Sequence, residues 1–210
     1  RRRHRVTFSR SRAFVYVRWT DESAVLAGLS RLMRRWDFIR QDVRLDDYRA
    51  VSGHEIRALY IHSPPEGSGW MTLAVEDLQN VLETAYSLSK ALEDVPVIVS
   101  RAYQYGDWEL KGYVGAECVM KLGDDPDHEL AWVGPKLTQE RVPRVVEQLG
   151  VDSKFAGFLQ TALMGEGGPD AFASALSLPS MREGFSELHS QSLPNWTFAS
   201  WVHKSSRYAA

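Results

Sequence analysis

The clearest pattern of apolar and polar positions lies between residues 108 and 122. Odd positions in this stretch are mostly charged or polar, whereas every even position is apolar or small: Trp108, Leu110, Gly112, Val114, Ala116, Cys118, Met120 and Leu122. A period of two with one apolar face is typical of a strand that lies on a core with water on its other side. The stretch is longer than a usual strand of about five or six residues. It therefore predicts two strands joined near Gly112 or Gly115.

The residues before this hairpin predict strands and amphipathic helices in a β-α-β-β-α-β order. Strands are expected at residues 13–19, 55–62, 70–75 and 95–103, and helices at 21–36 and 76–92; a short extra strand around Val43 and Leu45 stays open. Each helix carries one apolar stripe at three- and four-residue steps, which indicates one buried face. Two right-handed crossovers would place both helices on the same face of the sheet, as in ferredoxin-like sheets.

The residues after Leu122 change in character from strand to helix. A short strand is expected at 130–133, helices at 138–149, 153–163 and 169–176, and a closing strand at 196–202. We therefore predict an α+β fold in which a mainly antiparallel sheet has helices packed on one face and a helical C-terminal part. The expected detail is a ferredoxin-like core extended by a hairpin. The predicted division is a basic arm (1–12), a sheet domain (13–134) and a helical subdomain (135–210) packed on it.

Charge is distributed unevenly along the chain. Six of the 25 basic residues lie in the first twelve positions, which hold no acid, so residues 13–210 carry 19 basic and 27 acidic side chains, a net charge of −8. No apolar run approaches the roughly 18 residues needed to cross a membrane, and no secretory signal is visible. Cys118 is the single cysteine, which excludes an internal disulfide and fits a reducing compartment. A cytoplasmic location without membrane contact is therefore expected.

The most concentrated polar group is the turn Asp124-Asp125-Pro126-Asp127-His128-Glu129, followed by Trp132. Oxygen-rich loops bind calcium, but the EF-hand spacing fails, because Leu130 stands where the loop needs glycine and Lys136 where it needs glutamate. The turn is interpreted either as a solvated connection or as an acidic patch that binds a partner. The candidate partner-binding residues are Asp124, Asp125, Asp127, Glu129 and Trp132.

The other candidates for chemistry have simpler interpretations. Cys118 shares its parity with Met120 and Leu122, so it is expected to be a buried and unreactive thiol. The stretch Gly67-Ser68-Gly69 lacks the spacing of a serine nucleophile elbow, and residues 165–170 lack the lysine of a phosphate-binding loop. The six histidines show no metal-binding spacing. No catalytic residue, metal or cofactor is therefore predicted, and an enzyme is the less favoured class.

Three functions remain, and they differ in the part of the chain that they use. The favoured hypothesis is a non-enzymatic interaction protein that binds a basic protein partner, with the general character of an immunity protein that neutralises a toxin. A second is an enzyme with a cleft between the sheet and the C-terminal helices, where His62, His128 or His203 would meet a carboxylate. A third is a nucleic-acid binder that uses the arginine-rich N-terminal arm.

Overall fold

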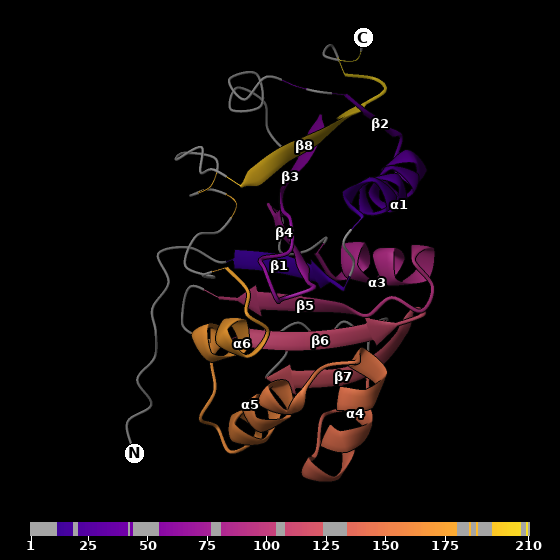
Figure 1. Cartoon of the computed structure of the whole chain (residues 1–210). Helices are drawn as coiled ribbons and strands as arrows, with labels where there is room; N and C mark the ends of the chain where they lie inside the picture. The colour runs from indigo at the N-terminus through magenta and orange to yellow at the C-terminus, as the bar shows by residue number, and fades with distance from the viewer. Residues whose placement is uncertain are drawn as a thin grey trace.

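The computed structural model describes residues 12–18, 21–41, 43, 55–76, 81–103, 108–123, 134–179, 185, 188, 195–206 and 209. These residues form one eight-stranded sheet in which every neighbouring pair of strands is antiparallel, with helices on both faces (Figure 1). The α+β class and the mainly antiparallel sheet predicted from the sequence are confirmed.

The bounds of the elements follow the predicted segments closely. The strands are β1 (Arg12–Val17), β2 (Phe38–Arg40), β3 (Ile56–His62), β4 (Met71–Val75), β5 (Val97–Ala102), β6 (Trp108–Val114), β7 (Glu117–Gly123) and β8 (Trp196–His203). The helices are α1 (Glu22–Arg35), α3 (Val81–Ala91), α4 (Val142–Leu149), α5 (Ser153–Leu163) and α6 (Pro169–Ala175), and a 3₁₀ turn, η2 (Gln139–Arg141), precedes α4. Across the sheet the strands follow the order β2-β8-β3-β4-β1-β5-β6-β7.

One face of the sheet is covered by α1 and α3. Asp21 is the N-cap of α1, and its carboxylate accepts hydrogen bonds from the backbone N–H groups of Ser23 and Ala24. Such a cap satisfies donors that the first turn of a helix leaves open. The buried residues of both helices join one apolar cluster with the odd-numbered residues of β1 and β5. The prediction that both helices lie on the same face is therefore confirmed.

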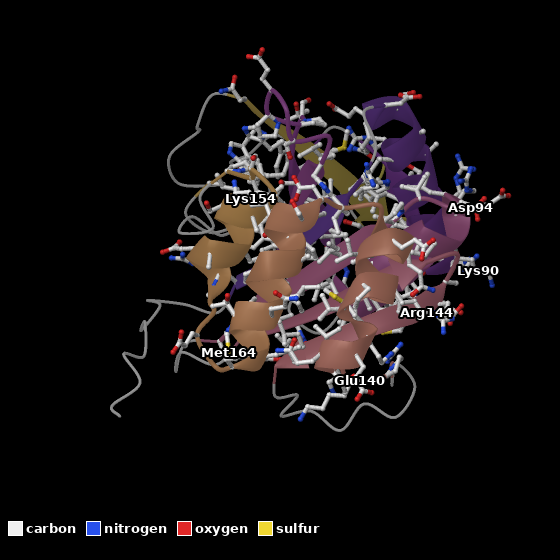
Figure 2. The ribbon with its side chains drawn as sticks, turned by 60° about the horizontal axis from the view of Figure 1, so that its bottom comes forward. Lys90, Asp94, Glu140, Arg144, Lys154 and Met164 are labelled. Atoms are coloured by element: carbon white, nitrogen blue, oxygen red, sulfur yellow. The ribbon has the colours of Figure 1, made fainter. Side chains whose placement is uncertain are left out.

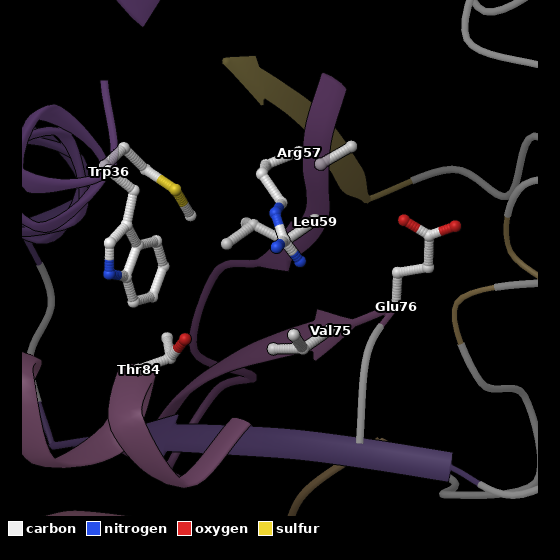
Figure 3. Close-up of a pocket in the computed structure, with 8 residues that line it drawn as sticks. Trp36, Arg57, Leu59, Val75, Glu76 and Thr84 are labelled. Atoms are coloured by element: carbon white, nitrogen blue, oxygen red, sulfur yellow. The ribbon is translucent and has the colours of Figure 1, made fainter. Parts of the chain in front are cut away.

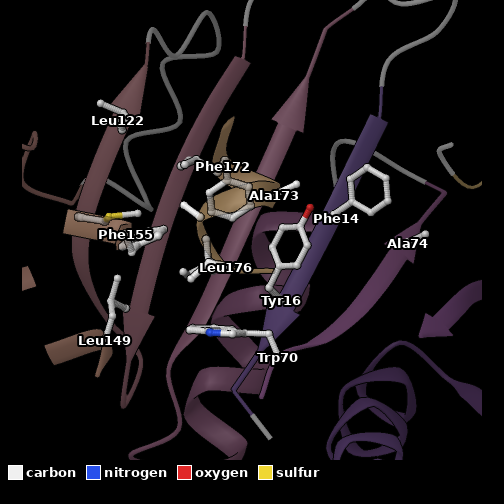
Figure 4. Packing of buried hydrophobic residues seen from close by; sticks show 14 of the residues in the cluster. Phe14, Tyr16, Trp70, Ala74, Leu122, Leu149, Phe155, Phe172, Ala173 and Leu176 are labelled. Carbon is white, nitrogen blue, oxygen red and sulfur yellow. The ribbon is translucent and has the colours of Figure 1, made fainter. Parts of the chain in front are cut away.

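The opposite face carries α4, α5 and α6. Helix α4 ends at Gly150, which has the left-handed φ of 59° that commonly closes a helix. Arg18, directly after β1, donates hydrogen bonds to the carbonyl oxygens of Leu149 and Gly150 and so ties this helix end to the sheet. Figure 4 shows how Tyr16, Phe155 and Phe172 meet between the strands and these helices. The C-terminal helices thus cover a second core rather than one edge.

The hairpin between β6 and β7 differs from the predicted one-sided layer. Gly115 and Ala116 form its two-residue turn, both with positive φ, and the pairing register shifts between Gly112 and Tyr113. Glu109 and Lys111, expected to face water, are each 1% exposed, because both faces of the sheet are covered. The prediction of a solvent-facing side is wrong for these residues.

The same register shift moves Cys118 to the other face. Tyr113 pairs with Cys118 whereas Gly112 pairs with Met120, so β7 holds an extra residue, Val119, at a β-bulge. Cys118 consequently packs with the cluster under α1 and α3, while Met120 and Leu122 belong to the cluster under the C-terminal helices. The prediction that these three residues share one face is wrong, because a bulge reverses the alternation of side chains.

The remaining predictions concern the ends of the sheet. The extra strand is β2, earlier in the chain than expected; Val43 lies outside the strands, and Leu45 and residues 130–133 lie outside the described residues. Strand β8 lies inside the sheet, between β2 and β3.

The ferredoxin-like detail and the domain boundaries stay predictions. No described helix has the length and apolar character that a membrane span requires.

Candidate functional site

The predicted partner-binding residues fall in a segment bounded by described residues on both sides. Residues 124–133, which we call the acidic segment, contain Asp124, Asp125, Asp127, Glu129 and Trp132 and lie outside the described residues. The segment follows Gly123, the last residue of the edge strand β7, and precedes Gly134. Its position in the fold is thus given by the residues at its two ends.

Both ends of the acidic segment are attached to the same part of the sheet. Gly123 pairs with Glu109 of β6, and the N–H of Lys121 donates to the carbonyl of Pro135 at 3.2 Å. The N–H of Leu137 then donates to the carbonyl of Lys121 at 2.8 Å. These bonds hold the returning chain beside β7, so the ten intervening residues begin and end at one rigid edge. Loops held by a rigid scaffold are common places for binding residues.

Gly134 lies directly against Cys118 at this edge. A Cβ atom built on Gly134 would overlap Cys118 Sγ and would lie 2.7 Å from Cys118 Cβ. The Cys118 thiol also donates to the carbonyl of Met120 at 3.4 Å. Burial raises the pKa of this thiol, and the nearby cations Lys111, Lys121 and Arg141 only partly oppose that effect. Cys118 is only partly buried, so the expectation of a fully buried cysteine is wrong, but the raised pKa favours the protonated thiol.

Replacing Gly134 with alanine is expected to lower the free energy of unfolding by about 1–3 kcal/mol, because the new methyl group has no space beside Cys118. Gly157→Ala in α5 is the matched control: its Cβ would meet nothing within 4 Å, and the same change should stabilise the helix by about 0.5–1 kcal/mol. Urea denaturation measures both variants. Equal effects in the two would contradict the close contact at Gly134.

An open groove lies near the other edge of the sheet, where β3 ends and β8 begins. It has a volume of about 560 Å³ and is lined by His62, Ser63, Pro64, Pro65, Asn195, Trp196 and Thr197. The rings of His62 and Trp196 meet edge to face at 5.0 Å, and His62 Nδ1 donates to the carbonyl of Ser63 at 2.6 Å. These lining residues carry no carboxylate, lysine or arginine. The groove offers an aromatic surface and neutral hydrogen-bonding groups.

A smaller recess lies on the face that carries α1 and α3. Figure 3 shows Trp36, Arg57 and Thr84 around it, with Leu59 and Val75 of the sheet forming its floor. Its volume of about 20 Å³ has room for about one water molecule. The recess is therefore too small for an organic ligand in this conformation.

A buried ion pair crosses β5 and β6 on the same face. Arg101 and Glu109 are directly opposite in the register, each is 1% exposed, and Arg101 Nε donates to Glu109 Oε1. The Arg101 guanidinium also lies 5.7 Å from the centre of the Tyr103 ring. A buried and paired carboxylate of this kind is a structural group, because its charge is already neutralised by a partner on the neighbouring strand.

The described histidines do not meet a carboxylate in the way that the enzyme hypothesis requires. His203 Nδ1 bonds to the hydroxyl of Ser205 at 2.7 Å, and its ring packs on Phe38 at 5.1 Å. His128 lies outside the described residues. Between the sheet and the C-terminal helices, the described residues form one apolar cluster. Among the described residues no cluster of histidine, cysteine and acidic side chains could hold a metal ion.

Comparison with protein families, with curated proteins and with solved structures finds no match to this chain. Function must therefore be argued from the geometry of its own surfaces. Of the surfaces described above, sequence reasoning located the acidic segment but missed the groove at His62 and Trp196. The two sides of that groove are more than 130 positions apart, and only the pairing of β3 with β8 brings them together.

Proposed function

We propose that this protein is a non-enzymatic interaction protein that binds a basic protein partner through the acidic segment. The observation that carries the proposal is that the segment leaves β7 at Gly123 and returns beside β7, where the backbone of Lys121 bonds to Pro135 and Leu137. A rigid base lowers the entropy cost of presenting charged side chains in one arrangement. Four carboxylates attract a basic surface over distance, and Trp132 supplies an aromatic anchor.

The charge of the chain after the basic arm supports a basic partner. Residues 13–210 carry a net charge of −8, so the field around this part of the protein favours the approach of cations. Within this class the proposal takes the form of a cytoplasmic immunity-type protein that neutralises a basic toxin by covering its surface. The open groove beside Trp196 lies near the other edge of the sheet. It offers a second contact surface, one without carboxylate, lysine or arginine.

Charge reversal tests the proposed site. The variant D124K/D125K/D127K/E129K is expected to weaken binding of a basic partner captured from the native cell by at least about tenfold, because attraction becomes repulsion. Trp132→Ala should weaken binding by about 30-fold if its indole is a central anchor. Affinity is measured by titration of the purified partner, at two salt concentrations.

The control reverses the same number of charges elsewhere. Glu66, Glu76, Glu147 and Glu166 are exposed, and their replacement by lysine alters the net charge by the same amount. This variant should keep most of the affinity. Partner binding that survives reversal in the acidic segment, or that falls equally in both variants, would show that the segment is not the binding site.

A further inference from the structure

The outer surface of α1 carries three arginines and no acid. Arg31, Arg34 and Arg35 are all exposed, and at about 100° per residue they span about 100° of the helix circumference. The other exposed residues of this helix are Ser23 and Ala27. We call the three guanidinium groups the α1 arginine face.

The helix dipole explains only part of this arrangement. Cations in the last turn of a helix are favourable, and Arg34 and Arg35 lie there. However, Arg31 precedes Arg34 by three residues and Arg35 by four, spacings at which like charges repel one another. None of the three forms an ion pair with a described carboxylate; Arg31 donates only to the backbone carbonyl of Ala91, at 3.4 Å. The cations are therefore left available for an external anion.

The surroundings of the α1 arginine face contain one further cation and two acids. The bond from Arg31 to Ala91 brings it beside the end of α3, where Lys90 is exposed. Two exposed acids, Glu93 and Asp94, follow α3, and Figure 2 shows Lys90 and Asp94 at this end of the molecule. The bond also fixes the position of Arg31, which reduces the side-chain entropy that binding an anion would cost.

The residue types distinguish between anionic partners. Arginine presents a planar fork of donors that fits the oxygens of a phosphate, and neighbouring guanidiniums on this helix start from Cβ atoms about 5–6 Å apart. A membrane-binding helix would carry large apolar residues beside its cations, whereas this surface has only serine and alanine between them. We propose that the α1 arginine face binds the phosphate backbone of nucleic acid, without reading its sequence.

This surface is separate from the proposed protein-binding site. Helix α1 packs beside β2, at one end of the eight-stranded sheet, and the acidic segment joins β7 at the other end (Figure 1). Helix α1 also packs on α3, and its Arg31 donates to the carbonyl of Ala91. The two surfaces therefore belong to different elements and carry opposite charges. Nucleic-acid binding by α1 does not require the protein-binding function.

The test uses the full chain and a fluorescein-labelled 20-base-pair DNA duplex of mixed sequence. The variant R31Q/R34Q/R35Q removes the three charges, and K136Q/R144Q/K154Q removes three exposed cations near the C-terminal helices, where Figure 2 shows Arg144 and Lys154. Three phosphate contacts contribute about 2.7 to the size of the slope of log affinity against log salt. Through these contacts, the affinity of the wild type for the duplex should fall about 40-fold when the salt concentration rises from 50 to 200 mM. The α1 variant should lose that part of the slope, and the control should keep it.

Several results would overturn the proposal. It fails if the wild type does not bind the duplex at 50 mM salt with a dissociation constant below about 100 µM. It also fails if the α1 variant binds like the wild type, since another cation such as those of the N-terminal arm would then be responsible. Equal weakening in both variants would indicate net charge alone. Binding to phosphatidylserine vesicles that depends on the α1 arginines, without duplex binding, would assign the surface to a membrane.

Discussion

Replacing Glu109 with leucine is expected to lower the free energy of unfolding by about 3–5 kcal/mol. The substitution removes the carboxylate that Arg101 Nε contacts and leaves a guanidinium that is only 1% exposed. Removing one partner of a buried ion pair costs several kcal/mol, because the remaining charge loses its stabilising contact without regaining water. Thermal or urea unfolding measures the change.

The double variant R101L/E109L separates the ion pair from the general effect of altering the core. Removing both charges replaces the whole ion pair with apolar side chains, so this variant should be more stable than E109L and close to the wild type. Glu109→Gln keeps the shape and a hydrogen-bonding oxygen and should fall between the two. A loss below about 1 kcal/mol in E109L would contradict a buried pair, because exposed pairs contribute about that much or less.

Replacing Phe172 with alanine is expected to cost about 3–5 kcal/mol. Phe172 is fully buried, and its ring meets those of Tyr16 at 5.2 Å, Phe158 at 5.8 Å and Phe155 at 6.1 Å. Helix α6 has only seven residues, too few to be stable by itself, so it depends on this contact with α5 and the sheet. The cavity left by the ring would weaken the whole layer of C-terminal helices.

Met164→Ala provides the comparison for Phe172→Ala. Met164 also has a large apolar side chain on a C-terminal helix end, but it is 67% exposed. Its replacement should change stability by no more than about 0.5 kcal/mol. Far-UV circular dichroism with urea titration compares the two variants. Similar effects from both substitutions would mean that α6 is not packed on the sheet through Phe172.

The candidate site was predictable only in part. The acidic segment is visible in the sequence because four carboxylates and a tryptophan lie within ten residues. The α1 arginine face could also be predicted from the helical spacing of its three arginines. The sequence does not show, however, that no described carboxylate pairs with them. The groove at His62 and Trp196 could not be found, because its two sides come from strands that are far apart in the chain.

The sequence by itself determined most of the elements, since each has a local cause. Asp21 caps α1, Gly150 ends α4, and apolar stripes mark which side of each helix is buried. The tertiary structure alone decided what covers each face of the sheet and where the alternation of side chains reverses. The bulge at Val119 reverses the alternation of side chains within β7. Helices cover both faces, so the side that was expected to face water is a second buried layer, which holds Lys111 and the Arg101–Glu109 pair. A period of two identifies a strand, but it does not show whether the polar side of the strand faces water or a packed helix. What covers that side depends on residues distant in the chain.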